Sequence, residues 1–127
     1  LVLALVPVQV EGDRRRLEEL LAELGTNALK HCPPGGEVRV VLRLEGNRAR
    51  LSVENDGPAI PAEDLPHLWE PFYKGDKSRS REGGGSGLGL ALVKGAAEAH
   101  KGTCRAENRS GGGVRFTIEL PALHSRT

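Results

Sequence analysis

Hydrophobic side chains recur at two different spacings along the chain, and each spacing predicts one kind of element. Over about 14–32 they recur every three or four positions, which predicts an amphipathic helix with an apolar side formed by Leu17, Leu20, Leu21, Leu24 and Ala28. Asp13 is a suitable N-cap residue for this helix, and Pro33 ends it. A second helix is predicted over 88–100, and because it is apolar on nearly every side we expect it to be buried. A third, short helix is expected over 64–69.

Alternating apolar and polar residues predict strands in most of the remaining chain. The clearest case is 38–44, where valines and leucines alternate with arginines, followed by a turn at 45–48 and a second strand that ends at Asn55. An extended run opens the chain at 1–10, and two last strands, about 103–107 and 114–120, flank a glycine-rich turn. We therefore expect a single α/β (α+β) domain over 1–127. It should be a two-layer sandwich, with one mixed sheet of the five-stranded type and about three helices packed on one face of it.

Composition narrows the function classes only slightly. With 127 residues and a net charge of +1, the chain suits one domain and gives no electrostatic argument for a nucleic-acid or membrane partner. No apolar run approaches the roughly 18 residues that a membrane span needs. Cys32 and Cys104 lack metal-ligand spacing and are interpreted as free thiols in or near the core. The absence of methionine leads us to expect a fragment of a longer protein. Because the opening apolar run is too short for a membrane span and lacks the charged front end of a signal peptide, we expect that fragment to be soluble and intracellular.

The glycine-rich stretch "EGGGSGLGLALVKG" at 82–95 has two possible roles. It lacks the Gly-Lys pair of a mononucleotide P-loop. It also lacks the third small residue of a dinucleotide fingerprint, because leucines occupy the corresponding positions. One interpretation is a flexible connector. The other is a glycine loop that leads into a helix N-terminus, where free N–H groups favour an anion such as phosphate.

Two polar stretches favour the second interpretation. In "ELGTNALKH", Glu23 and Asn27 lie one helical turn apart with Lys30 beside them, at the edge of the apolar side. Their oxygen atoms suit Mg²⁺ and its waters, and the lysine suits a phosphate, although three solvated helix residues would look the same. In "ENDGPAIP", Asp56 follows a strand. It either forms a plain turn or presents an acceptor to an exocyclic amine.

In this order the stretches resemble the ATP-binding catalytic domain of bacterial sensor histidine kinases, a fold shared with gyrase, mismatch-repair and heat-shock chaperone ATPases. "ELGTNALKH" resembles the N box, and "ENDGPAIP" resembles the first glycine box. "LWEPFYKGDKSRSR" resembles the F box, and "GGSGLGLALVK" resembles the second glycine box. The resemblance runs from about 10 to 120. It implies the Bergerat ATP-binding fold, with ATP and Mg²⁺ as cofactors.

The resemblance also implies roles for the N-box residues. Asn27 would bind the Mg²⁺ ion that bridges the ATP phosphates. Glu23, one turn earlier, would orient a water or assist proton removal. Lys30 would contact phosphate, and His31 would lie near the ribose or adenine.

The other implied positions surround the base and the phosphates. Asp56 would accept from the adenine amino group, and Gly57 would let the nucleotide approach the backbone closely. The segment 72–85 would form a mobile lid over the phosphates. The remaining ATP-binding positions implied are Ala59, Ile60, Phe72, Lys74, Arg79, Arg81, Gly85, Ser86, Gly87, Leu88 and Gly89.

Two residues depart from the family pattern. Ala59 stands where a second glycine is usual, so its methyl group could crowd the base pocket and weaken ATP binding. Gly25 lies inside the N-box helix, where glycine costs about 1 kcal/mol relative to alanine. It could mark close packing or a locally soft helix.

No histidine of the chain is followed by an acidic residue, as the family's phosphoacceptor is. The resemblance therefore implies a histidine acceptor on a separate dimerisation domain of the same protein, and indirectly a response regulator. The isolated domain would be monomeric, and the whole would be the cytoplasmic domain of a membrane-anchored bacterial sensor kinase. Two alternatives stay open: a same-fold ATPase or serine kinase of the anti-sigma type, and a non-catalytic nucleotide-binding regulator.

Overall fold

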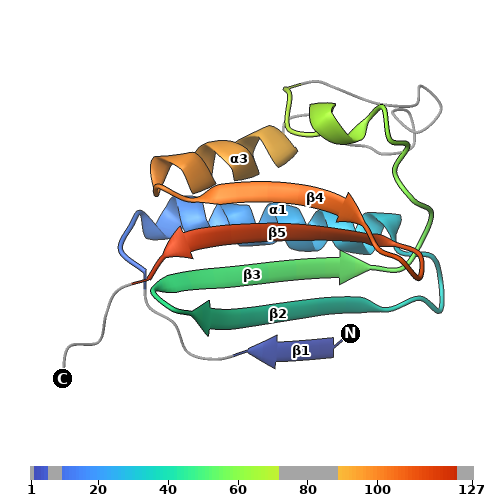
Figure 1. Ribbon diagram of the computed structural model, residues 1–127, viewed down its shortest axis with the longest axis horizontal. Coiled ribbons are helices and arrows are strands. Elements are labelled where there is room, and N and C mark those ends of the chain that lie inside the picture. Colours follow the sequence, from blue (N-terminus) through green and yellow to red (C-terminus); the bar gives the residue numbers. More distant parts are fainter. Residues whose placement is uncertain (1, 6–9, 72–88, 123–127) are drawn as a thin grey trace.

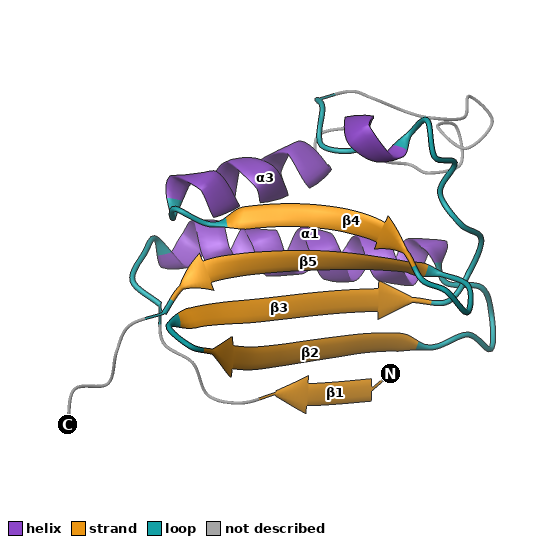
Figure 2. Cartoon of the chain, in the orientation of Figure 1, coloured by secondary structure: helices purple, strands orange, loops and turns teal. Residues whose placement is uncertain are grey.

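The computed structural model describes residues 2–5, 10–71 and 89–122, which form two layers (Figure 1). One layer is a five-stranded sheet in the order β1-β2-β3-β5-β4, and the other consists of helices packed on one face of that sheet (Figure 2). The strands are β1 (Val2–Leu5), β2 (Val38–Glu45), β3 (Arg48–Asn55), β4 (Thr103–Asn108) and β5 (Val114–Pro121). The helices are α1 (Arg14–His31), the 3₁₀ helix η1 (Leu65–His67) and α3 (Gly89–Ala99).

The sheet is mixed, as the sequence predicts. β1 runs parallel to β2, while the β2–β3, β3–β5 and β4–β5 pairs are antiparallel. Of the predicted opening strand over 1–10, the structure describes β1 at Val2–Leu5, while residues 1 and 6–9 lie outside the described part. The two-layer α/β sandwich is confirmed.

α1 begins and ends where the sequence predicts, within one residue. The Asp13 carboxylate accepts hydrogen bonds from the backbone N–H groups of Arg15 and Arg16, at 3.0 and 3.4 Å. This satisfies donors that a helix N-terminus otherwise leaves unpaired. At the other end, the N–H of Cys32 donates to the Ala28 carbonyl as the helix stops. Cys32 and Cys104 are both free thiols and half-buried, as expected.

α3 is less buried than its sequence suggests. Val93, Ala96 and Ala97 are buried, but Leu92 is 51% exposed. The expectation of burial on nearly every side is therefore wrong. The physical reason is that α3 belongs to the outer of two layers and packs its buried side against α1 and the sheet, which leaves its opposite side partly open to solvent. Its predicted first residue, Leu88, lies outside the described part.

The third predicted helix, over 64–69, forms only the 3₁₀ turn η1. Pro66 occupies its first turn, and the segment is too short to propagate an α-helix. Trp69 anchors the segment instead, because its ring packs edge-on against Phe116 of β5, with centroids 5.7 Å apart. The helical layer of the described chain thus contains two α-helices and one 3₁₀ turn, rather than three helices.

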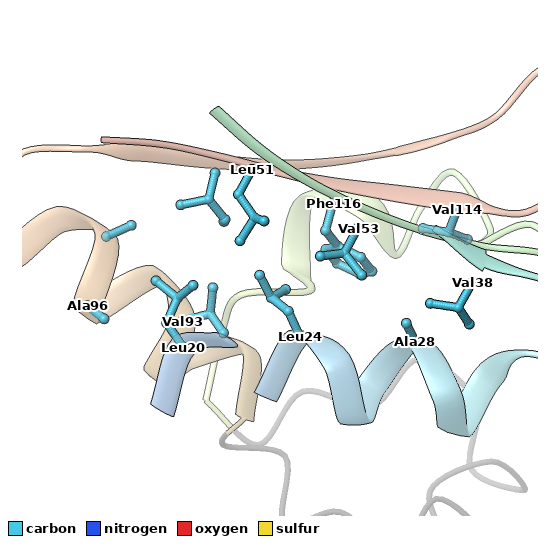
Figure 3. Packing of buried hydrophobic residues seen from close by; sticks show 12 residues of the cluster. Leu20, Leu24, Ala28, Val38, Leu51, Val53, Val93, Ala96, Val114 and Phe116 are labelled. Atoms are coloured by element: carbon cyan, nitrogen blue, oxygen red, sulfur yellow. The ribbon is translucent and has the colours of Figure 1, made fainter. Parts of the chain in front are cut away.

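The hydrophobic core lies between the helices and the sheet, where side chains from the two layers interdigitate (Figure 3). Leu20 and Leu24 of α1 and Val93 of α3 meet Val53 of β3 and Phe116 of β5. This packing fixes α1 beneath the sheet, and so fixes the polar residues along its edge. No helix in the described part of the chain is long and apolar enough to cross a membrane.

Candidate functional site

The C-terminal end of α1 packs directly against the loop that follows β3. Gly57 in this loop has φ of +137°, and a Cβ atom built on it would lie 2.8 Å from the backbone oxygen of His31. Only glycine accommodates both this backbone conformation and this contact without strain. The glycine of "ENDGPAIP" therefore joins the first glycine box to the end of the N-box helix.

The N-box helix also meets the start of α3. A Cβ atom built on Gly89 would overlap the Oε1 atom of Glu23, so the Glu23 carboxylate lies against the first residue of α3. The N-terminal turn of a helix carries unpaired N–H groups and the positive end of the helix dipole. Glu23, which is half-buried, is thus placed beside a surface suited to anions.

Asp56 is held by two groups and remains accessible. Its Oδ2 atom accepts from the backbone N–H of Glu37 at 2.9 Å, and its Oδ1 atom accepts from Nη1 of Arg109 at 3.3 Å. The side chain is nevertheless 46% exposed. A carboxylate has about four lone-pair sites. Two remain available at Asp56 for a donor such as an exocyclic amine.

Asn27 and Lys30 lie beside Glu23 on α1, as their spacing predicts. Asn27 is half-buried, whereas Lys30 and His31 are exposed. Within the described ranges, neither the Asn27 amide nor the Lys30 ammonium group hydrogen-bonds or pairs with another residue. Their polar atoms are therefore available to a ligand.

A divalent cation at this site would depend on few protein ligands. In the part of the chain that the structure describes, no group of three histidine, cysteine or acidic side chains could hold a metal by itself. Mg²⁺ commonly takes one or two protein oxygens and completes its shell with water and substrate phosphates. The half-buried Asn27 amide oxygen fits that pattern of ligation.

The predicted positions around the base and phosphates are only partly described. Ala59 is exposed, and Ile60 is half-buried. The structure provides no test of the lid or of most of the second glycine box. The predicted site residues outside the described part are Phe72, Lys74, Arg79, Arg81, Gly85, Ser86, Gly87 and Leu88.

Close packing does not explain Gly25. No described atom lies within 4 Å of a Cβ atom built on this residue. Of the two explanations that the sequence left open, close packing has no support among the described residues, and the locally soft helix stays a prediction.

Two residues of the β4–β5 hairpin contact the candidate site, and the sequence did not point to them. Asn108 exchanges two hydrogen bonds with the backbone of Ile60, and Arg109 reaches Asp56. Their local signal is only a polar pair before a glycine-rich turn. A pairing between residues this far apart cannot be derived from the spacing in one sequence.

The fold and the meeting of these motifs define a Bergerat-type ATPase domain. A family model described as "Histidine kinase-, DNA gyrase B-, and HSP90-like ATPase" matches residues 12–124, and the chain belongs to this family. The resemblance to sensor histidine kinases is confirmed by its relatives.

SenX3 of Mycobacterium tuberculosis, a sensor-like histidine kinase, is 43% identical over 116 residues. The match covers 91% of this chain and 28% of SenX3, so the chain spans little more than a quarter of this curated relative. Among solved structures, the mycobacterial sensor histidine kinase MprB aligns with a TM-score of 0.87 and 33% identity, over 95% of this chain and 82% of that chain. Full-length ShkA in complex with AMPPNP aligns with a TM-score of 0.78 and 25% identity, over 99% of this chain and 26% of that chain.

Proposed function

We propose that this chain binds Mg-ATP and transfers the γ-phosphoryl group to a histidine on a separate dimerisation domain. The observation that carries the proposal is the contact between Glu23 and Gly89, because it brings the N-box helix against the start of α3. Family membership supports ATP as the ligand, and the AMPPNP complex of ShkA is consistent with it.

Adenine recognition is assigned to the loop after β3. The exposed Asp56 carboxylate accepts a hydrogen bond from the 6-amino group of adenine, and Gly57 keeps the nearby backbone free of side chains. A guanine base presents an oxygen at the same position, which would face the carboxylate as a second acceptor. Asp56 therefore selects ATP over GTP.

Phosphate binding is assigned to α1 and to the start of α3. The Asn27 amide oxygen would hold Mg²⁺, Lys30 would contact a phosphate oxygen, and Glu23 would orient a water or take part in proton removal. When bound, Mg²⁺ neutralises charge on the phosphates. Phosphoryl transfer depends mainly on such positioning and charge neutralisation, which matches a site made of an amide, an ammonium group and helix N–H groups.

The acceptor is assigned to another domain, since none of the chain's histidines precedes an acidic residue. We propose that a histidine-containing dimerisation domain of the same protein receives the phosphoryl group and passes it to a response regulator. This places the chain in the cytoplasmic part of a membrane-anchored sensor kinase.

The test is phosphotransfer in trans. The chain is incubated with γ-labelled ATP, Mg²⁺ and the purified dimerisation domain, with an acceptor His→Gln variant of that domain as the control. The expected product is a label on the dimerisation domain that is stable to alkali and lost in acid, as phosphohistidine is.

The same experiment separates the alternatives. An acid-stable label on serine would indicate a serine kinase, and phosphate release without labelling would indicate an ATPase. Nucleotide binding with neither reaction would indicate a non-catalytic regulator. Each of these results would contradict the proposed transfer.

A further inference from the structure

We propose that the β4–β5 hairpin sets the geometry of adenine recognition, with Asn108 and Arg109 as positioning residues that act through the loop at Asp56–Ile60. The inference rests on the proposed function, because it assigns Asp56 as the adenine acceptor. Neither residue needs to touch the nucleotide. Each fixes a different end of the loop that does.

Asn108 fixes Ile60, at the C-terminal end of the loop. Its Oδ1 atom accepts from the Ile60 N–H at 2.8 Å, and its Nδ2 atom donates to the Ile60 carbonyl at 2.9 Å. The side-chain amide thus pairs with both backbone polar groups of one residue, and the Ile60 side chain packs against the hydrophobic core. Two hydrogen bonds in this arrangement fix both the position and the orientation of that residue.

Arg109 fixes Asp56, at the N-terminal end of the same loop. Its Nη1 atom lies 3.3 Å from Oδ1 of Asp56, and its Nε atom lies 3.4 Å from Oε1 of Glu54. The Arg109 side chain is only 19% exposed and that of Glu54 is 13% exposed, so the guanidinium group is largely enclosed between two carboxylates. Glu54 is fixed in turn by Arg115, at 2.7 Å.

The consequence for Asp56 is a fixed carboxylate. Arg109 binds one oxygen, and the Glu37 N–H binds the other. The two remaining lone pairs then point in a set direction before any nucleotide arrives. Pre-organisation of this kind increases affinity by reducing the ordering that binding requires.

The turn between β4 and β5 packs against the backbone at the start of this loop. Gly113 has φ of +90°, and a Cβ atom built on it would overlap the carbonyl oxygen of Asn55, next to Asp56. The Arg109 N–H donates to the Gly113 carbonyl at 2.9 Å, which closes the turn. Asn108 and Arg109 are therefore presented by a rigid support rather than by a loose loop.

The test is a double-mutant cycle on nucleotide affinity. The dissociation constants of ATP and of its 6-oxo analogue, inosine triphosphate, are measured for the wild type, Arg109→Gln, Asp56→Ala and the double variant. Arg109→Gln should weaken ATP binding about tenfold, as for loss of a charge-assisted hydrogen bond. It should leave the affinity for the 6-oxo analogue unchanged. In the Asp56→Ala background it should have no further effect on ATP, because its influence passes through that carboxylate.

Asn108→Ala should likewise weaken ATP binding, about fivefold for two exchanged neutral hydrogen bonds near the surface. Ser110→Ala in the same hairpin is the matched control for Asn108. Arg105→Gln is the control for Arg109, since Arg105 is exposed on β4 and has no ion pair within the described ranges. Both controls should bind ATP normally. Arg109→Lys should recover part of the lost affinity, and thermal unfolding identifies any variant that is not folded.

Three results would overturn the inference, and they differ from failure of the proposed function. The first is normal ATP affinity in both Arg109→Gln and Asn108→Ala while Asp56→Ala binds weakly. The second is a cycle in which the affinity losses from Arg109→Gln and Asp56→Ala simply add. The third is an equal loss of affinity for ATP and for the 6-oxo analogue, which would indicate a purely structural hairpin. Unchanged ATP affinity in Asp56→Ala would instead remove the base-reading role that the proposed function gives to Asp56.

Discussion

The backbone oxygen of His31 lies so close to Gly57 that a Cβ atom at position 57 would be only 2.8 Å away. This contact joins the end of α1 to the loop after β3. It thereby connects the predicted metal and phosphate residues on the helix with the predicted base-reading residue. The close approach of these two parts of the candidate site depends on this glycine, which also has a positive φ.

Gly57→Ala should therefore damage stability and binding together. A non-glycine residue at this φ costs about 1–3 kcal/mol, before the steric conflict with His31 is counted. We expect a drop of that size or more in the free energy of unfolding, measured by urea denaturation, and weaker ATP binding by titration calorimetry. Gly111→Ala is the matched control, because no described atom lies within 4 Å of a Cβ atom built on Gly111 and its φ is not positive. Equal stability of the two variants would contradict the account.

Gly25→Ala should have the opposite effect on stability. Gly25 lies in the interior of α1, and the space beside it is open among the described residues. Alanine should stabilise the helix by about 0.5–1 kcal/mol, mainly by restricting the unfolded chain. Thermal unfolding followed by circular dichroism would measure this. A lower melting temperature would show that position 25 has a packing partner after all.

Much of the fold could be predicted because its elements carry strong local signals. The Asp13 cap, the helical spacing of α1 and the alternation in β3 depend only on nearby residues, and the structure confirms them. Two residues of the predicted apolar faces are instead exposed, Leu21 of α1 at 51% and Leu44 of β2 at 53%, so the predicted alternation does not hold along β2. The exposure of Leu92 could not be predicted in the same way. It depends on how many layers cover α3, which is a property of the tertiary structure.

Cys104 provides a test of burial through its ionisation. Burial on β4 raises the pKa of the Cys104 thiol to about 11, so the reactive thiolate is scarce at pH 8. In a Cys32→Ser variant, folded Cys104 should react with iodoacetamide on the order of 100-fold more slowly than in the unfolded chain. The rate should rise with pH up to about 11. Equal rates in the folded and unfolded chains would contradict the assigned burial.

The same raised pKa has a consequence for stability at high pH. The unfolded thiol ionises at its ordinary value, near pH 8.5, before the folded one does. The stabilisation that the buried, uncharged Cys104 thiol adds to the folded state is therefore fully present below that pH. It is lost as the pH rises towards about 11. Comparison of the wild type with Cys104→Ala between pH 7 and pH 10 would isolate this contribution, and parallel curves would contradict it.

Ala59→Gly tests the departure from the family pattern. Ala59 is exposed in the structure and follows Asp56 by three residues, which leaves its methyl group open to contact with a bound base. If the methyl group crowds the adenine, glycine should tighten ATP binding by roughly tenfold, the lower end of the range for one methyl-sized group in a pocket. Unchanged affinity in a calorimetric titration would show that Ala59 is neutral.

The site itself could be predicted only where its residues belong to contiguous motifs. Glu23, Asn27 and Lys30 fall within one helical segment, and Asp56 and Gly57 fall within one loop. Arg109 contributes through a contact across the sheet that no local spacing encodes. The proposed base-reading loop could therefore be picked out from the sequence, whereas the contacts that the hairpin makes with it require the structure.

The most direct test of the account is the Mg²⁺ dependence of ATP binding. ATP is titrated into the wild type, Asn27→Ala and Asn47→Ala, each with Mg²⁺ and with a chelator. Asn47 is the matched control, since it is exposed in the β2–β3 turn and contributes its backbone oxygen to a hydrogen bond with Ala122. We predict that Mg²⁺ tightens ATP binding in the wild type and in Asn47→Ala but not in Asn27→Ala. Equal tightening in all three proteins would contradict the assignment of Asn27, and with it the Mg-ATP site.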